Sequence, residues 1–180
     1  TAYEISLGLV GSEMCIRDRT IIENLKKSRI NDIFIKLIVD YVEKLSNYVQ
    51  VSGVLLFGSV ARNKAHPVHS DIDLIIISPQ FDITPTRKVD LRIKISRNLP
   101  SGVDSIWLGE KEIISVFNAF TGVLLDGLYE GIILYDPKGI LVKLRETLLR
   151  ALKQKKIERV LGMWRLPIRK RGEKIKLPPW

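Results

Sequence analysis

Two aspartates separated by one residue, Asp71 and Asp73, are the side chains of this sequence best suited to chemistry. They open the run DIDLIIIS, whose continuous apolar residues are typical of a buried strand, and Pro79 closes it. Successive side chains of a strand point to opposite faces, so both carboxylates lie on one face. Neighbouring anions raise each other's pKa unless a cation neutralises them, and Mg²⁺ prefers such oxygen ligands together with substrate phosphates. The pair predicts a magnesium site; the alternative is a chance Asp-x-Asp pattern in which one aspartate caps a turn.

Gly58 and Ser59 form a candidate phosphate site, because they directly follow the apolar run at residues 53–57. Glycine has no Cβ, so a phosphate can approach the backbone closely at Gly58. Ser59 stands where a short helix is expected to begin, and it offers a hydroxyl and backbone N–H groups to an anion. The alternative is an ordinary turn in which Ser59 only caps the helix. The hydrolase motif G-x-S-x-G, the P-loop motif G-x-x-x-x-G-K-[ST] and the dinucleotide motif G-x-G-x-x-G are all absent from the sequence.

Together the two motifs, GSVAR at residues 58–62 and SDIDLIII at residues 70–77, resemble the signature of the nucleotidyltransferase superfamily related to DNA polymerase β. The similarity is closest to its small stand-alone members, the minimal nucleotidyltransferases of archaea and bacteria, and it extends over about residues 51–135. This resemblance implies nucleotide binding by Gly58, Ser59, Arg62 and Ser70, and metal binding by Asp71 and Asp73.

The loop between the two motifs departs from the family pattern. A glycine usually follows the arginine, but this sequence has Asn63, which also tolerates a left-handed turn. The loop at residues 60–70 is one residue longer than the commonest spacing, and it contains His66 and His69. Because only Cys15 could join these histidines as a further metal ligand, we favour a solvated loop over a metal site.

A third carboxylate on a neighbouring strand is needed in this family, and Asp104 in the run GVDSIW is the favoured candidate. It stands early in an apolar strand that follows a helix, which is where the family places this residue. Asp90 on a predicted helix and Asp82 in a predicted loop are the alternatives. By the resemblance, Asp71, Asp73 and Asp104 are the catalytic residues and ligate two Mg²⁺ ions, and a nucleoside triphosphate, ATP in the leading hypothesis, is the substrate.

The leading hypothesis for function is transfer of a nucleoside monophosphate, most simply AMP, to a hydroxyl of an acceptor. Acceptors in this family include antibiotics, nucleic-acid ends and protein side chains, and one branch modifies a HEPN-type toxin and so acts as its antitoxin. The resemblance therefore implies a HEPN-type partner protein. The alternative is a non-catalytic binding module with a degenerate transferase fold, which would have no reason to keep a pair of buried like charges.

The elements that must position these residues alternate between helix and strand. The predicted strands are residues 53–57, 71–78, 103–108 and 132–135, and the predicted helices are about residues 29–49, 85–97, 110–129 with a break near Thr121, and 139–160. Residues 163–180 have no period and are predicted to be irregular. This order predicts an α+β fold, mixed α/β in pattern, with a small mixed sheet flanked by helices and a basic C-terminal helix.

Residues 1–19 fit poorly with the rest of the chain. The string AYEISLGLVGSEMCIRDR resembles translated sequencing adapter, so we expect its removal to leave folding and activity unchanged. The predicted organisation is this foreign extension, a nucleotidyltransferase domain at residues 20–137, and a basic C-terminal helix and tail at residues 138–180. The single cysteine, Cys15, excludes an internal disulfide and fits a reducing, cytoplasmic setting. No apolar run approaches the roughly 18 residues of a membrane span.

The positive charge of the protein is concentrated at one end of the chain. The net charge is +9, and residues 138–180 contain 14 of the 29 Lys and Arg residues but only 3 of the 20 Asp and Glu residues. Such asymmetry indicates either a polyanionic partner, with nucleic acid as the leading example, or simply a solvated basic helix and tail. Both interpretations stay open at the level of the sequence.

Overall fold

The computed structural model describes residues 17–67 and 69–166. Its centre is a four-stranded sheet in the order β3-β2-β1-β4. The strands are β1 (Gly53–Phe57), β2 (Ile72–Ile77), β3 (Val103–Leu108) and β4 (Ile132–Tyr135). β1 pairs antiparallel with β2 and β4, whereas β2 and β3 run parallel because α4 (Pro85–Ser96) crosses over between them. The predicted α+β fold with a small mixed sheet is confirmed.

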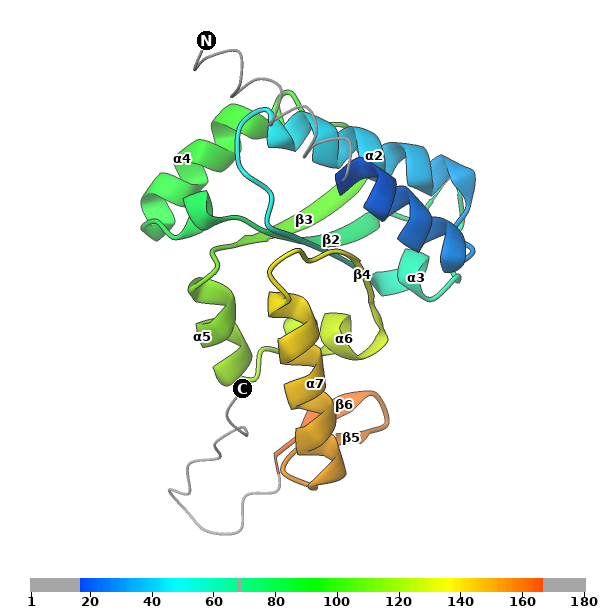
Figure 1. The fold of residues 1–180 in the computed structure, drawn as a ribbon, viewed down its shortest axis with the longest axis vertical. Helices are drawn as coiled ribbons and strands as arrows, with labels where there is room; N and C mark the ends of the chain where they lie inside the picture. The colour runs from blue at the N-terminus through cyan, green and yellow to red at the C-terminus, as the bar shows by residue number, and fades with distance from the viewer. Residues whose placement is uncertain (1–16, 68, 167–180) are drawn as a thin grey trace.

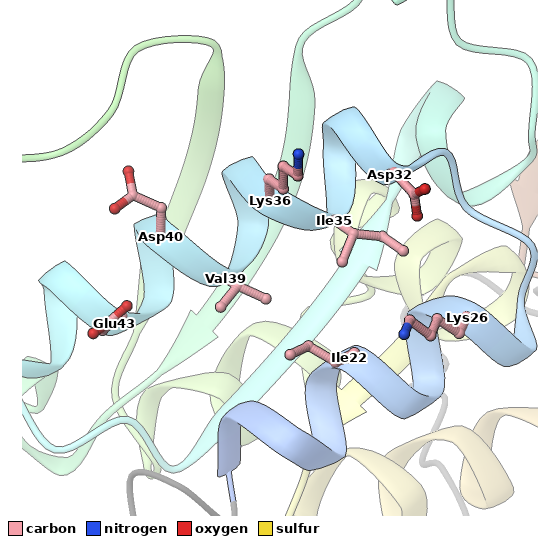
Figure 2. Close-up of a pocket in the computed structure, with 8 residues that line it drawn as sticks. All are labelled: Ile22, Lys26, Asp32, Ile35, Lys36, Val39, Asp40 and Glu43. Atoms are coloured by element: carbon pink, nitrogen blue, oxygen red, sulfur yellow. The ribbon is translucent and has the colours of Figure 1, made fainter.

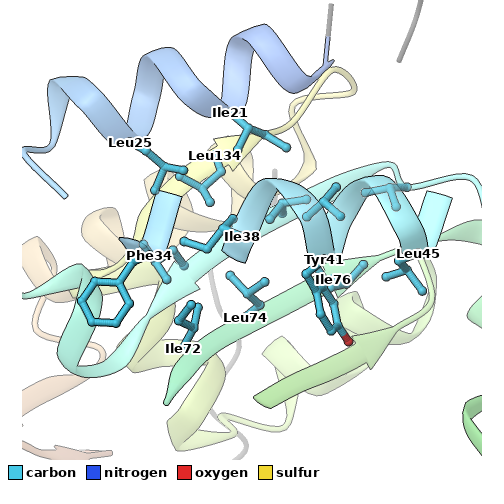
Figure 3. Close-up of a cluster of buried hydrophobic side chains, with 14 of the residues drawn as sticks. Ile21, Leu25, Phe34, Ile38, Tyr41, Leu45, Ile72, Leu74, Ile76 and Leu134 are labelled. Atoms are coloured by element: carbon cyan, nitrogen blue, oxygen red, sulfur yellow. The ribbon is translucent and has the colours of Figure 1, made fainter. Parts of the chain in front are cut away.

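Helices cover both faces of this sheet (Figure 1). α2 (Asp32–Ser46), α4 and the helix of residues 17–27 lie over one face, and α5 (Glu112–Asn118), α6 (Gly122–Glu130) and α7 (Ile140–Lys153) lie over the other. Alternate residues of β2 therefore enter two different cores. Ile72, Leu74 and Ile76 pack under α2, as Figure 3 shows, and Ile75 and Ile77 pack toward α5, α6 and α7. This burial on both faces explains why β2 is a continuous apolar run.

The predicted helix at residues 110–129 is two helices with a break close to Thr121. Phe120 has a left-handed backbone with φ 55°, which ends α5 and lets the chain turn into α6. In the described part of the chain no single helix is long and apolar enough to cross a membrane, although α5 and α6, bent by 97°, meet that requirement as a pair.

The segment after α7 differs from the prediction. The helix expected to reach residue 160 ends at Lys153, and β5 (Glu158–Val160) pairs antiparallel with β6 (Met163–Arg165). Leu161 and Gly162 form the turn with φ 52° and 79°, the left-handed pair that suits a tight hairpin. The predictions of helix at 154–160 and of irregular structure at 163–165 were therefore wrong. The rest of the predicted irregular tail, residues 167–180, lies outside the described residues.

The helix of residues 17–27 begins inside the segment that the sequence analysis set aside. Arg17 is buried, and its guanidinium donates to Asp18 Oδ1 at 2.8 Å and to Ser46 Oγ of α2. Ile21 and Leu25 of the same helix are fully buried in the core against α2. The domain boundary predicted at residue 20 therefore cuts through a helix that packs on the domain, and residues 17–19 belong with it.

Arg17→Ala is expected to lower the free energy of unfolding by about 1–3 kcal/mol, because a buried charged hydrogen-bonding group is lost from the contact with α2. Arg19→Ala, two residues along on the exposed side of the same helix, is the matched control and should change it by less than about 0.5 kcal/mol. Urea unfolding of both variants measures the difference. Equal stabilities would show that residues 17–19 add nothing to the domain.

Candidate active site

The ends of three adjacent strands bring the predicted site residues together. Phe57 at the end of β1 lies opposite Asp73 of β2, and Asp73 lies opposite Asp104 of the parallel strand β3. Asp71 precedes Asp73 by two residues, so the strand alternation places it on the same face. Gly58 directly follows Phe57, which puts the glycine motif and the aspartate motif at one end of the sheet.

The charge environment of Asp73 is unfavourable for an ionised carboxylate. Its pKa is raised, first by burial and then by the negative charges of Asp104 and Asp71, while the charge of Arg62 opposes the shift. Asp104 is 75% exposed, and its Oδ1 lies 3.9 Å from Nη2 of Arg92 on α4. The charges of the three aspartates therefore interact with one another, with Asp73 partly buried and Asp104 facing solvent.

Gly58 is required by both its backbone conformation and its neighbour. Its φ of 71° lies in the left-handed region, and a Cβ at this position would overlap the carboxylate of Asp73. Only glycine lets the chain turn from β1 into α3 (Gly58–Ala61) while the Asp73 carboxylate lies against the turn. Ser59, which is half-buried, directly follows the glycine that contacts the Asp73 carboxylate.

Gly58→Ala is expected to be more destabilising than a substitution that disturbs the backbone alone. Gly139 is the matched control, since its φ is 67° and nothing lies within 4 Å of a Cβ built there. Gly139→Ala should cost about 1 kcal/mol from the left-handed backbone, and Gly58→Ala should cost a further 1–3 kcal/mol, roughly, from overlap with Asp73. Urea unfolding compares the two. Equal losses would mean that the Asp73 carboxylate is not held against Gly58.

The loop between the motifs is closed by its own hydrogen bonds. Asn63 has φ 54°, the left-handed conformation that an asparagine tolerates, and its side chain donates to the carbonyl of Ser28 at 3.2 Å. Ser70 Oγ accepts from the backbone N–H of His66 at 2.9 Å, and the Ser70 N–H donates to the His66 carbonyl at 3.0 Å. The rings of His66 and His69 stack with centroids 4.9 Å apart. Ser70 thus fixes the loop, and its contact with nucleotide stays a prediction.

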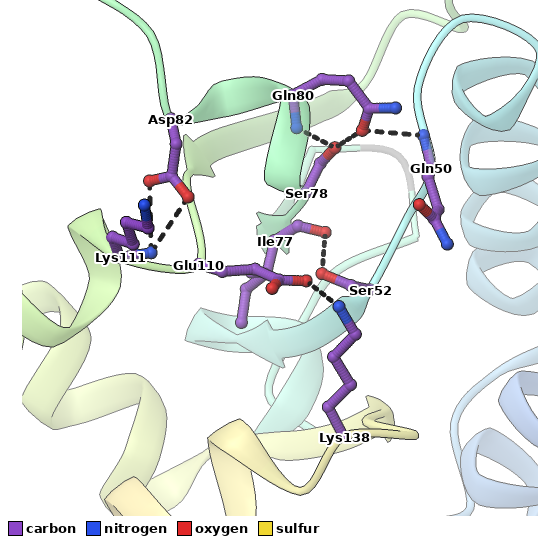
Figure 4. A network of polar contacts seen from close by, with 9 residues as sticks. All are labelled: Gln50, Ser52, Ile77, Ser78, Gln80, Asp82, Glu110, Lys111 and Lys138. Carbon is purple, nitrogen blue, oxygen red and sulfur yellow. Dashed lines mark hydrogen bonds and ion pairs between the residues drawn. The ribbon is translucent and has the colours of Figure 1, made fainter.

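The alternatives to Asp104 lie elsewhere. Asp82 follows β2 at the opposite end of the sheet and caps α5. Its carboxylate accepts from the backbone N–H of Lys111, as Figure 4 shows, and also from that of Glu112. Asp90 lies exposed on α4. Asp104 alone among the three is in register with Asp73. The geometry therefore favours Asp104 as the third carboxylate.

The carboxylates suit a divalent cation by type, although they do not form a ready-made metal cage. In residues 17–67 and 69–166 no group of three or more His, Cys, Asp or Glu side chains is placed to hold a metal ion. Three carboxylates on one face, one of them with a pKa raised by its neighbours, are nevertheless the donor set that Mg²⁺ neutralises. Metal binding by Asp71, Asp73 and Asp104 stays a prediction.

Sequence reasoning missed two residues that contact this site. Glu130 at the end of α6 accepts from Nη1 of Arg62 at 3.3 Å, and Arg92 faces Asp104. Neither residue belongs to a motif, and both reach the site only through the packing of helices on the sheet. In the sequence, Glu130 is marked only as a charged residue between an apolar helix and the apolar strand β4.

A groove of about 430 Å³ between the helix of residues 17–27 and α2 is separate from this site (Figure 2). Ile22, Ile35 and Val39 form its apolar part, and charged residues such as Lys26 and Glu43 line its rim. It lies on the α2 side of the sheet. The carboxylates share the opposite face with Ile75 and Ile77, so the groove is not part of the candidate site.

Several solved structures are similar to this chain. A toxin–antitoxin structure with AMP-PNP is 19% identical, covers 69% of this chain and 88% of its own, and has a TM-score of 0.40. A candidate nucleotidyltransferase from Sulfolobus solfataricus is 20% identical, with coverages of 66% and 89% and a TM-score of 0.40. A mutant of the toxin–antitoxin pair MntA–HpeT is 16% identical, with coverages of 64% and 85% and a TM-score of 0.42. At these values the likeness carries no argument about function.

A match at the level of the protein family is more informative. No curated protein sequence matches the chain. The family model described as nucleotidyltransferase domain matches residues 35–120, a span that contains the glycine motif, the aspartate motif and Asp104. Residues 35–120, slightly less than half of the chain, are therefore similar to a nucleotidyltransferase domain.

Proposed function

We propose that the protein transfers a nucleoside monophosphate, AMP in the leading case, from a nucleoside triphosphate to a hydroxyl in a reaction that depends on Mg²⁺. The observation that carries this proposal is the strand register that aligns Gly58, Asp73 and Asp104 at one end of the sheet. The raised pKa of Asp73 supports it, because a bound cation would relieve the repulsion among the three carboxylates.

Each residue has a distinct role in this proposal. Gly58 and Ser59 hold the triphosphate, because the glycine leaves the backbone open and the serine adds a hydroxyl. Asp71 and Asp73 hold Mg²⁺, which when bound neutralises phosphate charge and lowers the pKa of a hydroxyl. Asp104 faces solvent beside this pair, where an acceptor can reach it.

The proposed step is an in-line displacement at the α-phosphorus. The acceptor oxygen forms a bond to this phosphorus, and the bond between the phosphorus and the oxygen that bridges to the β-phosphate breaks. Pyrophosphate leaves with that electron pair, and the hydroxyl proton passes to Asp104 and on to water. Positioning and charge neutralisation supply the rate, so no covalent bond to the chain is needed.

The acceptor in this proposal is a protein side chain of a HEPN-type partner, inside the cytoplasm where ATP is available. The resemblance of the two motifs to minimal nucleotidyltransferases motivates this assignment. The test is mass spectrometry of a protein encoded next to this gene after incubation with the enzyme, ATP and Mg²⁺. A mass increase of one AMP that disappears with Asp73→Asn supports the proposal. An unmodified partner together with pyrophosphate release onto another acceptor would contradict the assigned acceptor but not the transferase activity.

Nucleic acid is a second candidate partner, favoured by the exposed cations of the C-terminal part. They lie on the outer side of α7 and in the turn after it: Lys143, Lys153, Lys155 and Lys156.

A non-catalytic binding module is the competing function. It predicts partner affinity that does not change with Asp71→Asn or Asp73→Asn and no pyrophosphate release under any condition.

A further inference from the structure

One carboxylate at the edge of the candidate site is shared by two arginines. Glu130 ends α6, and its Oε2 lies 3.3 Å from Nη1 of Arg62, while its Oε1 accepts from Nη1 of Arg159 on β5. Arg62 follows Ser59 by three residues, and its positive charge lowers the pKa of Asp73. Glu130 therefore links the glycine motif at residues 58–62 to the C-terminal hairpin of β5 and β6. This hairpin lies outside residues 35–120, the span matched by the family model.

The two arginines are held very differently. The Arg159 side chain is only 20% exposed, and it also pairs with Asp126 at 3.2 Å. Its guanidinium carbon lies 4.8 Å from the ring centroid of Tyr129 and 5.5 Å from that of Trp164. Trp164 in turn donates from Nε1 to Asp126 at 2.9 Å. Arg159 is thus fixed by two carboxylates and two aromatic rings.

Arg62, by contrast, is 43% exposed, and within residues 17–67 and 69–166 its one ion pair is the longer of the two on Glu130. The pKa of Glu130 is lowered chiefly by its hydrogen bond with Arg159, and the contribution of Arg62 is smaller. Arg159 therefore neutralises more of the negative charge of Glu130 than Arg62 does. The ion pair between Arg62 and Glu130 is correspondingly weak, so a more highly charged anion such as a triphosphate can displace Glu130 from Arg62.

We propose that Arg159 is a positioning residue: it neutralises Glu130 so that Arg62 can leave this carboxylate for the triphosphate. The inference rests on the proposed function, because it takes Arg62 as a nucleotide-binding residue. In the absence of Arg159, the Glu130 carboxylate would not be neutralised and would attract Arg62 more strongly. It would then compete with the phosphates of the nucleotide for the Arg62 guanidinium. The C-terminal hairpin would thereby set the affinity of the nucleotide site without touching the nucleotide.

The proposal predicts weaker nucleotide binding for one variant and no weakening for the other. Arg159→Gln should raise the Kd for Mg–ATP by about three- to tenfold, because Glu130 then retains Arg62. Glu130→Gln removes the competing charge at nearly constant shape, so its Kd should be equal to or lower than that of the wild type. The double variant should behave like Glu130→Gln. Arg165→Gln is the control, since Arg165 pairs with Glu158 inside the same hairpin at 2.8 Å.

Titration of the wild type and of the four variants with a fluorescent ATP analogue and Mg²⁺ gives five affinities, and urea unfolding shows that each variant is folded. A purely structural role for the hairpin would weaken binding in both single variants, and the double variant would be the weakest; this result overturns the proposal. Equal Kd values for wild type, Arg159→Gln and Arg165→Gln also overturn it, while the proposed function stands. A wild type that binds no nucleotide overturns the proposed function itself.

Discussion

Asp71→Asn and Asp73→Asn are each expected to abolish nucleotidyl transfer, with a loss of about a thousandfold or more in kcat/KM. An amide carries no net charge, so each variant loses half of the anionic pair proposed to hold Mg²⁺ and, through it, the triphosphate. Asp40→Asn on the exposed side of α2 makes the same change in charge away from the site and should retain full activity. Pyrophosphate release with ATP, Mg²⁺ and the acceptor measures all three.

The fold should survive these substitutions and gain stability from one of them. Folding raises the pKa of Asp73, so the native state holds this proton more tightly than the unfolded state, and the ionised carboxylate destabilises the fold at neutral pH. This cost disappears as the pH falls through the raised pKa toward the ordinary value of 3.8. Asparagine has no charge to lose. Asp73→Asn should therefore be more stable than the wild type at neutral pH, with an advantage that shrinks as the pH falls. An advantage that grows in acid would show that the carboxylate is stabilised by its surroundings.

Asp104→Asn is expected to lower kcat by about a hundred- to ten-thousandfold while changing the KM for ATP little. Asp104 faces solvent and is proposed to act on the acceptor, whereas the triphosphate is proposed to be held by the residues that follow β1 and by the aspartates at the start of β2. Asp90→Asn on α4 is the control with the same chemical change. Steady-state kinetics at varied ATP separates the two constants. A raised KM with an unchanged kcat would move Asp104 from the reaction to nucleotide binding.

The sequence was sufficient where one residue pattern served both the fold and the site. The apolar run after Asp73 predicted β2, and the same alternation predicted the shared face of Asp71 and Asp73. The glycine at position 58 marked the turn, because its left-handed backbone and its contact with Asp73 exclude a side chain. Such local constraints can be inferred from a single sequence.

The sequence alone did not predict the elements whose structure depends on tertiary contacts. β5 and β6 have three residues each, too few for a period, and they are fixed to α6 by Arg159 and Trp164. The helix of residues 17–27 was divided because its first turn resembles foreign sequence, yet Arg17 is buried beside α2. The sequence favoured Asp104 over Asp82, but the position of Asp104 directly opposite Asp73 depends on strand register, which no local pattern specifies.

The most direct test of the proposed function is a calorimetric titration of the protein with ATP in the presence and absence of Mg²⁺, for the wild type beside Asp71→Asn. Binding by the wild type that requires Mg²⁺, and that weakens by at least about tenfold in the variant, is the predicted result. It would establish the aspartate pair as the metal-dependent nucleotide site. A wild type that shows no Mg²⁺-dependent binding to any nucleoside triphosphate would contradict the account.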